Sequence, residues 1–142
     1  MIKPTATSNW EYEKIVGGSG TPTIQFTSVP CFNTFHNLVG RVIHINPRQY
    51  RVAVYIQVRG GWWTKSTFAQ PLTRIRYTGV FTTDITTGGI DQQANKIAAY
   101  LVPEGYLPPA MWGGATLPQA LNTNAIASII IERGTSCPVV IP

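Results

Sequence analysis

Residues 50–58 read Tyr-Arg-Val-Ala-Val-Tyr-Ile-Gln-Val, and after a short break residues 61–65 read Gly-Trp-Trp-Thr-Lys. Side chains alternate between the two faces of an extended strand, so this run has two distinct faces. One face carries Val52, Val54, Ile56 and Val58, and the other carries Arg51, Ala53, Tyr55, Gln57 and Arg59. The first face is expected to lie in a core. The second is amphipathic and is expected to be partly wet, so a ligand can lie on it.

Similar short runs on both sides of this strand predict an all-β fold. We expect strands over 38–45, 67–75, 80–85, 97–102 and 125–133, with Pro71 confining the second of them to an edge or a bulge. Single helical turns are expected at 91–95, with Asp91 as the cap, and at 117–121. Seven or eight strands separated by turn signals indicate a single-domain antiparallel β-sandwich with a long loop near residues 103–118.

The domain is expected to span 28–142. Residues 1–27 are expected to be a leading segment or linker that can hold one strand, at 10–16. The 142 residues suffice for one domain with a real core, and 44% of them are hydrophobic. Charged residues make up only 12%, about half the usual share. With 13 Gly and 11 Pro, this composition is typical of extracellular β proteins.

The balance of charge gives only weak support for a polyanionic partner. The formal net charge is +5, but the arginines are scattered and the excess reflects a scarcity of acids. No stretch approaches the ~20 apolar residues of a membrane-spanning helix, so no membrane partner is expected. The first residues lack the apolar segment of a signal peptide. We therefore expect a domain excised from a longer secreted chain, which fits the composition better; an intracellular protein is the alternative.

Two cysteines, Cys31 and Cys137, lie near the two ends of the predicted core. First and last strands of sandwiches often lie close together, so a disulfide is geometrically possible in a secreted protein. It would close a loop of roughly 100 residues and contribute about 3–5 kcal/mol under the chain-entropy model. The alternative is two unrelated buried thiols.

The sequence offers little for catalysis. A glycosidase needs two carboxylates across a cleft, and Asp84 and Asp91 could be neighbours, but both occupy turn contexts in which capping explains them. His36 and His44 have no metal-ligand companions at a suitable spacing. We expect no enzyme activity and no cofactor. A structural Ca²⁺ held by the two aspartates is a minor alternative.

Large aromatic residues near loops point to a surface that stacks on flat ligands. Trp62 and Trp63 are consecutive, so one indole is expected to be buried and the other exposed, and the order is open. Tyr106 and Trp112 lie in the Pro/Gly-rich loop. Indole and phenol rings bury the apolar face of a β-linked glucosyl ring, while rim groups bind its hydroxyls. The rim groups expected nearest the Trp pair are Tyr55, Gln57, Arg59 and Lys65.

Several motifs together resemble a known family. In order they are residues 50–56, Gly-Trp-Trp-Thr-Lys at 61–65, Thr-Asp-Ile-Thr-Thr-Gly-Gly at 83–89, Ile-Ala-Ala-Tyr-Leu-Val-Pro at 97–103 and Gly-Tyr-Leu-Pro-Pro at 105–109. This succession, over roughly 29–134, resembles carbohydrate-binding module family 81, whose members are attached to bacterial polysaccharide-degrading enzymes. Where related sequences tend to read Lys-Pro, this chain has Lys65-Ser66.

The resemblance implies a monomeric, noncatalytic β-sandwich that binds β-glucans: cellulosic β-1,4 or mixed-linkage glucan, or xyloglucan. Its partners would be the polysaccharide and an appended glycoside hydrolase, which the module keeps near its substrate. Two alternatives remain open, a single-stranded nucleic-acid binder and an Ig-like structural or adhesion module without a small ligand. Whether the site is a groove or a chain-end pocket is also open.

Overall fold

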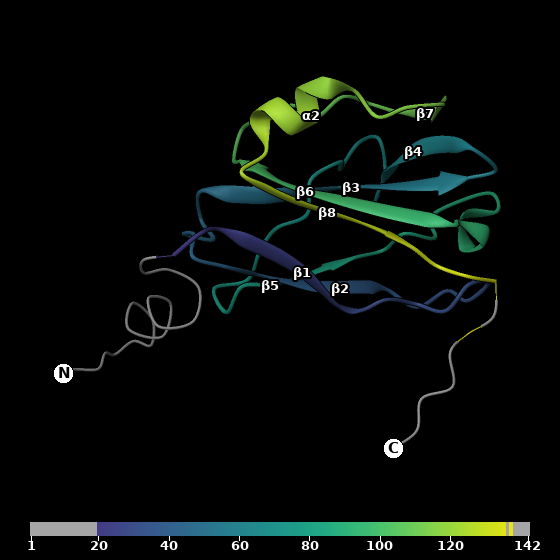
Figure 1. The fold of residues 1–142 in the computed structure, drawn as a ribbon, viewed down its shortest axis with the longest axis horizontal. Coiled ribbons are helices and arrows are strands. Elements are labelled where there is room, and N and C mark those ends of the chain that lie inside the picture. The colour runs from purple at the N-terminus through teal and green to yellow at the C-terminus, as the bar shows by residue number, and fades with distance from the viewer. Residues whose placement is uncertain (1–19, 136, 138–142) are drawn as a thin grey trace, which may run out of the picture.

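Two antiparallel sheets pack face to face in the computed structural model, which describes residues 20–135 and 137 (Figure 1). The smaller sheet has the order β1-β2-β5, formed by β1 (Thr23–Ser28), β2 (Leu38–Ile43) and β5 (Val80–Thr83). The larger has the order β7-β4-β3-β6-β8, formed by β3 (Tyr50–Val58), β4 (Gly61–Lys65), β6 (Lys96–Pro103), β7 (Trp112–Gly114) and β8 (Ala127–Glu132). The predicted all-β fold is confirmed.

The core between the sheets comes from the face of β3 that alternation assigned to it. Val52, Val54 and Ile56 are fully buried there, against Phe81 of the smaller sheet and Leu101 of β6. β3 pairs with β6 over residues 50–57 and with β4 over residues 54–58. The central strand thus fixes the position of every residue in its two neighbours.

The opposite face of β3 corrects the expectation of a wet surface. Ala53 and Tyr55 are buried, and they pack with Trp62, Tyr100 and Leu121 in a second apolar cluster. The segment after β6, with helix α2 (Gln119–Asn124), covers this face, and Figure 1 shows α2 on the side of the larger sheet opposite β1, β2 and β5. The molecule therefore has three layers, and the part of this face around Ala53 and Tyr55 is covered and cannot serve as the expected ligand surface.

Two predicted segments differ in detail. Residues 67–75 form no strand beyond one isolated antiparallel bridge from Thr73 to Val52, and Pro71 has no backbone N–H to donate to a longer ladder. The long loop at 103–118 contains the three-residue strand β7, which pairs with β4. β4 itself follows β3 through a tight hairpin, in which Arg59 and Gly60 both have positive φ, as a type I′ turn requires.

The two ends of the described chain are tied together. Cys31 and Cys137 form the expected disulfide. β1 begins in the segment 1–27 that was expected to hold one strand and ends at residue 28, whereas the strand expected at 10–16 lies outside the described residues. Within the described part of the chain, neither helix is long and apolar enough to cross a membrane.

Candidate functional site

A cavity of about 710 Å³ opens at the edge of the sandwich, beside β4. Trp63 pairs with Ile56 and Lys65 with Val54, so both side chains lie on the face of the larger sheet that is turned toward the smaller one. β1 contacts β8 and β6, so the three-stranded sheet lies under the β8 edge of the larger sheet. With only three strands it does not reach the other edge, at β4 and β7. At the β4 edge, the loop after β5, residues 84–90, takes the place of a further strand of the smaller sheet. The cavity lies between that loop and β4.

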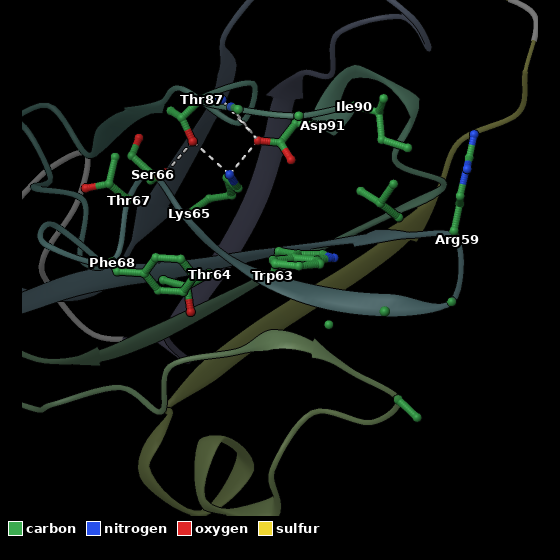
Figure 2. Close-up of a pocket in the computed structure, with 17 residues that line it drawn as sticks. Arg59, Trp63, Thr64, Lys65, Ser66, Thr67, Phe68, Thr87, Ile90 and Asp91 are labelled. Carbon is green, nitrogen blue, oxygen red and sulfur yellow. Dashed lines mark hydrogen bonds and ion pairs between the residues drawn. The ribbon is translucent and has the colours of Figure 1, made fainter.

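Trp63 supplies the main apolar surface of the cavity. Its side chain is 37% exposed, whereas that of its neighbour Trp62 is 6% exposed and lies in the second apolar cluster. Figure 2 shows the indole edge-on, with Lys65, Thr87 and Asp91 grouped on one side of it. One flat face of a large aromatic ring is thereby presented beside a row of polar groups, which is the arrangement expected of a stacking site.

Lys65 and Asp91 form a buried ion pair along the polar side of the cavity. Lys65 Nζ donates to Asp91 Oδ2 at 2.5 Å and to Thr87 Oγ1 at 2.7 Å. The same carboxylate oxygen accepts the backbone N–H groups of Thr87 and Gly88. Among the described residues, Asp91 Oδ1 has no hydrogen-bond partner, so it can accept one from a ligand.

Asp91 therefore has a different role from the helix cap that the sequence suggested. It is the first residue of the 3-10 turn η2 (Asp91–Gln93), whose N-cap is Ile90, and no side chain caps that turn. Instead, its carboxylate closes the preceding loop at residues 87–88. Thr87 adds a bond from its hydroxyl to the carbonyl of Ser66 at 2.7 Å. The loop and β4 thus hold each other in one geometry.

Aromatic surface continues beyond the cavity. Phe68 lines it and is 48% exposed, and its ring meets Trp112 edge to face with centroids 5.2 Å apart. Trp112 is 74% exposed and does not line the cavity itself. Trp112, predicted to bind ligand, is thus exposed but lies outside the cavity lining. Trp63 on β4, Trp112 on β7 and Phe68, which follows β4, together form an aromatic surface beside the cavity.

Gly113 sets how close β7 lies to the indole. It has φ +89°, and a Cβ at this position would lie 3.1 Å from Cζ2 of Trp63. A Cβ on Gly61 would in turn lie 2.8 Å from the carbonyl oxygen of Gly113. The β4–β7 edge therefore needs glycine at both positions, and Gly113 leaves the indole unobstructed.

Three of the residues predicted to bind ligand lie elsewhere. Trp62 and Tyr55 are buried in the second apolar cluster, where neither offers a ring face to a ligand; Tyr55 donates its hydroxyl to Pro109 O at 2.6 Å. Tyr106 is half-buried and packs against the same cluster. The expectation that these three residues bind ligand is therefore corrected. The segment after β6, which includes Tyr106, covers the other two, and no local sequence pattern indicates that it does.

Gln57 is half-buried opposite Trp62, so it too faces away from the cavity. Lys65 does line the cavity, but two of its three N–H groups are already engaged. Arg59 is exposed on its rim and forms no ion pair with any described residue. Of the predicted residues, Trp63 and Lys65 are therefore brought together at the cavity, with Arg59 at its rim.

The two aspartates are not arranged as a metal site. Asp84 Oδ1 accepts from Thr86 N and Oγ1, within a local turn. Asp91 already faces a cation, Lys65 Nζ. Within the described residues no group of three His, Cys, Asp or Glu side chains could hold a metal ion. The idea of a Ca²⁺ shared by these two carboxylates thus has no geometric support here.

Sequence reasoning missed Phe68 and the loop from Thr87 to Asp91 as parts of the site. The Thr-Gly-Gly stretch at 87–89 was noted only as a motif, although its glycines mark a loop in which backbone groups can approach a ligand. Phe68 follows β4 by three residues and carries no distinguishing pattern. In comparisons with known proteins, no family model, curated protein or solved structure matches this chain.

Proposed function

We propose that this protein is a noncatalytic carbohydrate-binding module that holds a segment of β-glucan in the cavity beside Trp63. The single observation that carries the proposal is the half-exposed indole of Trp63 facing a polar row of Lys65, Thr87 and Asp91. A glucosyl ring needs both surfaces at once, an apolar plate for its C–H face and hydrogen-bonding groups for its equatorial hydroxyls. A volume of about 710 Å³ falls within the range of small-ligand sites.

Preorganisation supports the proposal. The polar groups are held by one another: Lys65 by Asp91 and Thr87, and Thr87 by Ser66. Side chains fixed before binding lose little entropy when a ligand arrives. Asp91 Oδ1 can then accept from a sugar hydroxyl, and the exposed Arg59 can donate to one at the rim. The Phe68–Trp112 pair offers a second contact for a longer chain.

Two further features fit a secreted module attached to a glycoside hydrolase. The Cys31–Cys137 disulfide suits an oxidising compartment. The motif order over 29–134 resembles carbohydrate-binding module family 81, as set out above. In such a parent enzyme the module would raise the effective concentration of polysaccharide near the catalytic domain, without chemistry of its own.

The charge at the cavity disfavours the nucleic-acid alternative. Its charged lining groups are Arg59, Lys65 and Asp91, and the last two neutralise each other. A single-stranded nucleic-acid site needs a basic track along the phosphates, and its affinity falls steeply with salt. Sugar binding by stacking and neutral hydrogen bonds should change little with salt.

Titration calorimetry with cellopentaose, at low and high salt, tests the proposal. We expect micromolar to low-millimolar binding that is insensitive to salt. Trp63→Ala should cost about 2 kcal/mol or more, roughly thirtyfold in Kd. Tyr77→Ala is the matched control, because Tyr77 is an exposed aromatic that does not line the cavity. No heat with cellopentaose or a xyloglucan oligosaccharide, or equal losses in both variants, would refute the proposal.

A further inference from the structure

A second cavity, of about 480 Å³, lies next to the first and has a different chemistry. Two arginines line it, together with the hydroxyl or amide residues Ser66, Gln70, Thr73 and Thr82. Ser66 lines both cavities, so they are neighbours along the chain that leaves β4. No aspartate or glutamate is among the residues that line the second cavity.

The isolated bridge between Val52 and Thr73 explains why the two arginines line the same cavity. The bridge is antiparallel and is closed by hydrogen bonds in both directions, Val52 N to Thr73 O at 3.0 Å and Thr73 N to Val52 O at 2.8 Å. Arg51 and Arg74 are the residues one position away from the bridge, both at the same end of the antiparallel pairing, and both line the cavity.

Two positive charges that line one cavity repel each other unless an anion lies between them. Neither arginine has a carboxylate partner among the described residues, where the ion pairs are Lys65–Asp91 and Lys96–Glu132. Arg51 is half-buried and its Nη1 donates to Tyr50 O at 2.8 Å, which orients the guanidinium and leaves its other N–H groups for a ligand. Arg74 is exposed.

We propose that Arg51 and Arg74 form a binding site for a small oxyanion, and that its source is the carboxylate of a uronic acid in a polysaccharide. Guanidinium groups present paired N–H donors that match the two oxygens of a carboxylate, and an anion between them removes their mutual repulsion. Gln70 and Thr82 supply neutral donors for the adjacent hydroxyls of the same sugar. Only the polysaccharide origin of the uronic acid rests on the proposed function; the oxyanion site does not.

The test follows the side-chain Nε–H signals of Arg51 and Arg74 by NMR in the 142-residue protein, at low ionic strength. Sodium glucuronate is the probe, and glucose, which differs by having a hydroxymethyl group in place of the carboxylate, is the matched neutral ligand. We expect both arginine signals to shift with glucuronate and to stay in place with glucose. Failure of both signals to shift with glucuronate overturns the proposal.

Variants separate a built site from general attraction to a basic protein. Arg51→Gln and Arg74→Gln should each weaken glucuronate about tenfold or more, as expected for loss of a charge-assisted pair. Arg76→Gln, an equal charge change at an exposed arginine outside the cavity, should leave the affinity unchanged. Arg74 is exposed, so its variant folds even if Arg51→Gln does not. Equal weakening in all three variants overturns the site.

Inorganic sulfate distinguishes the source of the anion. Binding of sulfate without binding of glucuronate overturns the uronic-acid assignment. Binding of glucuronate at the arginines supports it, with or without sulfate. Cellopentaose acts at Trp63 rather than here, so loss of the glucan response with an intact glucuronate response refutes the proposed function alone, and the converse result refutes the oxyanion site alone.

Discussion

Lys65 Nζ lies 2.5 Å from Asp91 Oδ2 and joins strand β4 to the loop that closes the candidate sugar site. Both side chains are about nine-tenths buried, at 9% and 12% exposure. The pair lines the cavity, and it sets the shape of the cavity because it holds the loop against β4. A second ion pair, Lys96–Glu132, spans 3.9 Å and is far more exposed, at 38% and 77%.

Lys65→Met should destabilise the fold by roughly 3 kcal/mol, because it leaves the Asp91 carboxylate buried without its cation. Lys96→Met, the same chemical change at the exposed pair, should cost less than about 1 kcal/mol. Urea unfolding followed by far-UV circular dichroism measures both. Similar losses in the two variants would mean that the Lys65–Asp91 pair contributes no more than a surface pair.

Gly113→Ala should cost more stability than Gly60→Ala. Both glycines have a left-handed φ, +89° and +81°, so both substitutions carry a backbone penalty of about 1–2 kcal/mol. A Cβ on Gly113 also crowds Trp63, whereas a Cβ on Gly60 meets nothing within 4 Å. We expect an excess loss of about 1 kcal/mol or more in Gly113→Ala from overpacking. Equal free energies of unfolding in the two variants would contradict the Trp63 contact.

Burial raises the pKa of the Tyr55 hydroxyl well above its usual value of about 10, and the nearby Tyr106 and Tyr100 raise it further. The native state therefore keeps this proton longer than the unfolded chain does. The stability that Tyr55 contributes is complete below about pH 10 and falls by up to about 1.4 kcal/mol for each pH unit above it, until the pKa of the folded state is reached.

Tyr55→Phe should show this linkage directly. At neutral pH the variant should lose about 1 kcal/mol, because Pro109 O loses its donor. Above about pH 10 the difference from the natural protein should shrink, since the variant has no hydroxyl to ionise at this position. Tyr77→Phe, at an exposed tyrosine, is the control and should keep the natural pH dependence. A constant difference between Tyr55→Phe and the natural protein up to pH 11 would contradict the burial of an un-ionised Tyr55.

The central strands could be predicted because their signals are local. Val52, Val54 and Ile56 form a face made only of β-branched aliphatic residues, and this pattern alone predicts that they lie in the core, as they do. The same reasoning predicted that the indoles of Trp62 and Trp63 lie on opposite faces, which the structure confirms. It could not say which indole is exposed, since that depends on α2 and the segment after β6 covering the other face.

The candidate site itself was only half predictable, because it depends on contacts between distant segments. Trp63 and Lys65 were named from their positions near the strand end. Asp91 was expected to cap its own helical turn, yet its carboxylate bonds Lys65, 26 residues away. Arg51 and Arg74 line one cavity because a single bridge pairs their neighbours Val52 and Thr73. Neither relationship leaves a periodic pattern in the chain.

The most direct test of the central claim is an NMR titration of the indole Nε1–H signals with cellopentaose, with each signal assigned from a Trp→Phe variant. We predict that the Trp63 signal shifts in a saturable way, that the Trp112 signal shifts less, and that the signal of the buried Trp62 barely moves. A Trp63 signal that stays in place through saturating glucan, whatever the other indoles do, would contradict the assignment of the cavity beside Trp63 as the sugar site.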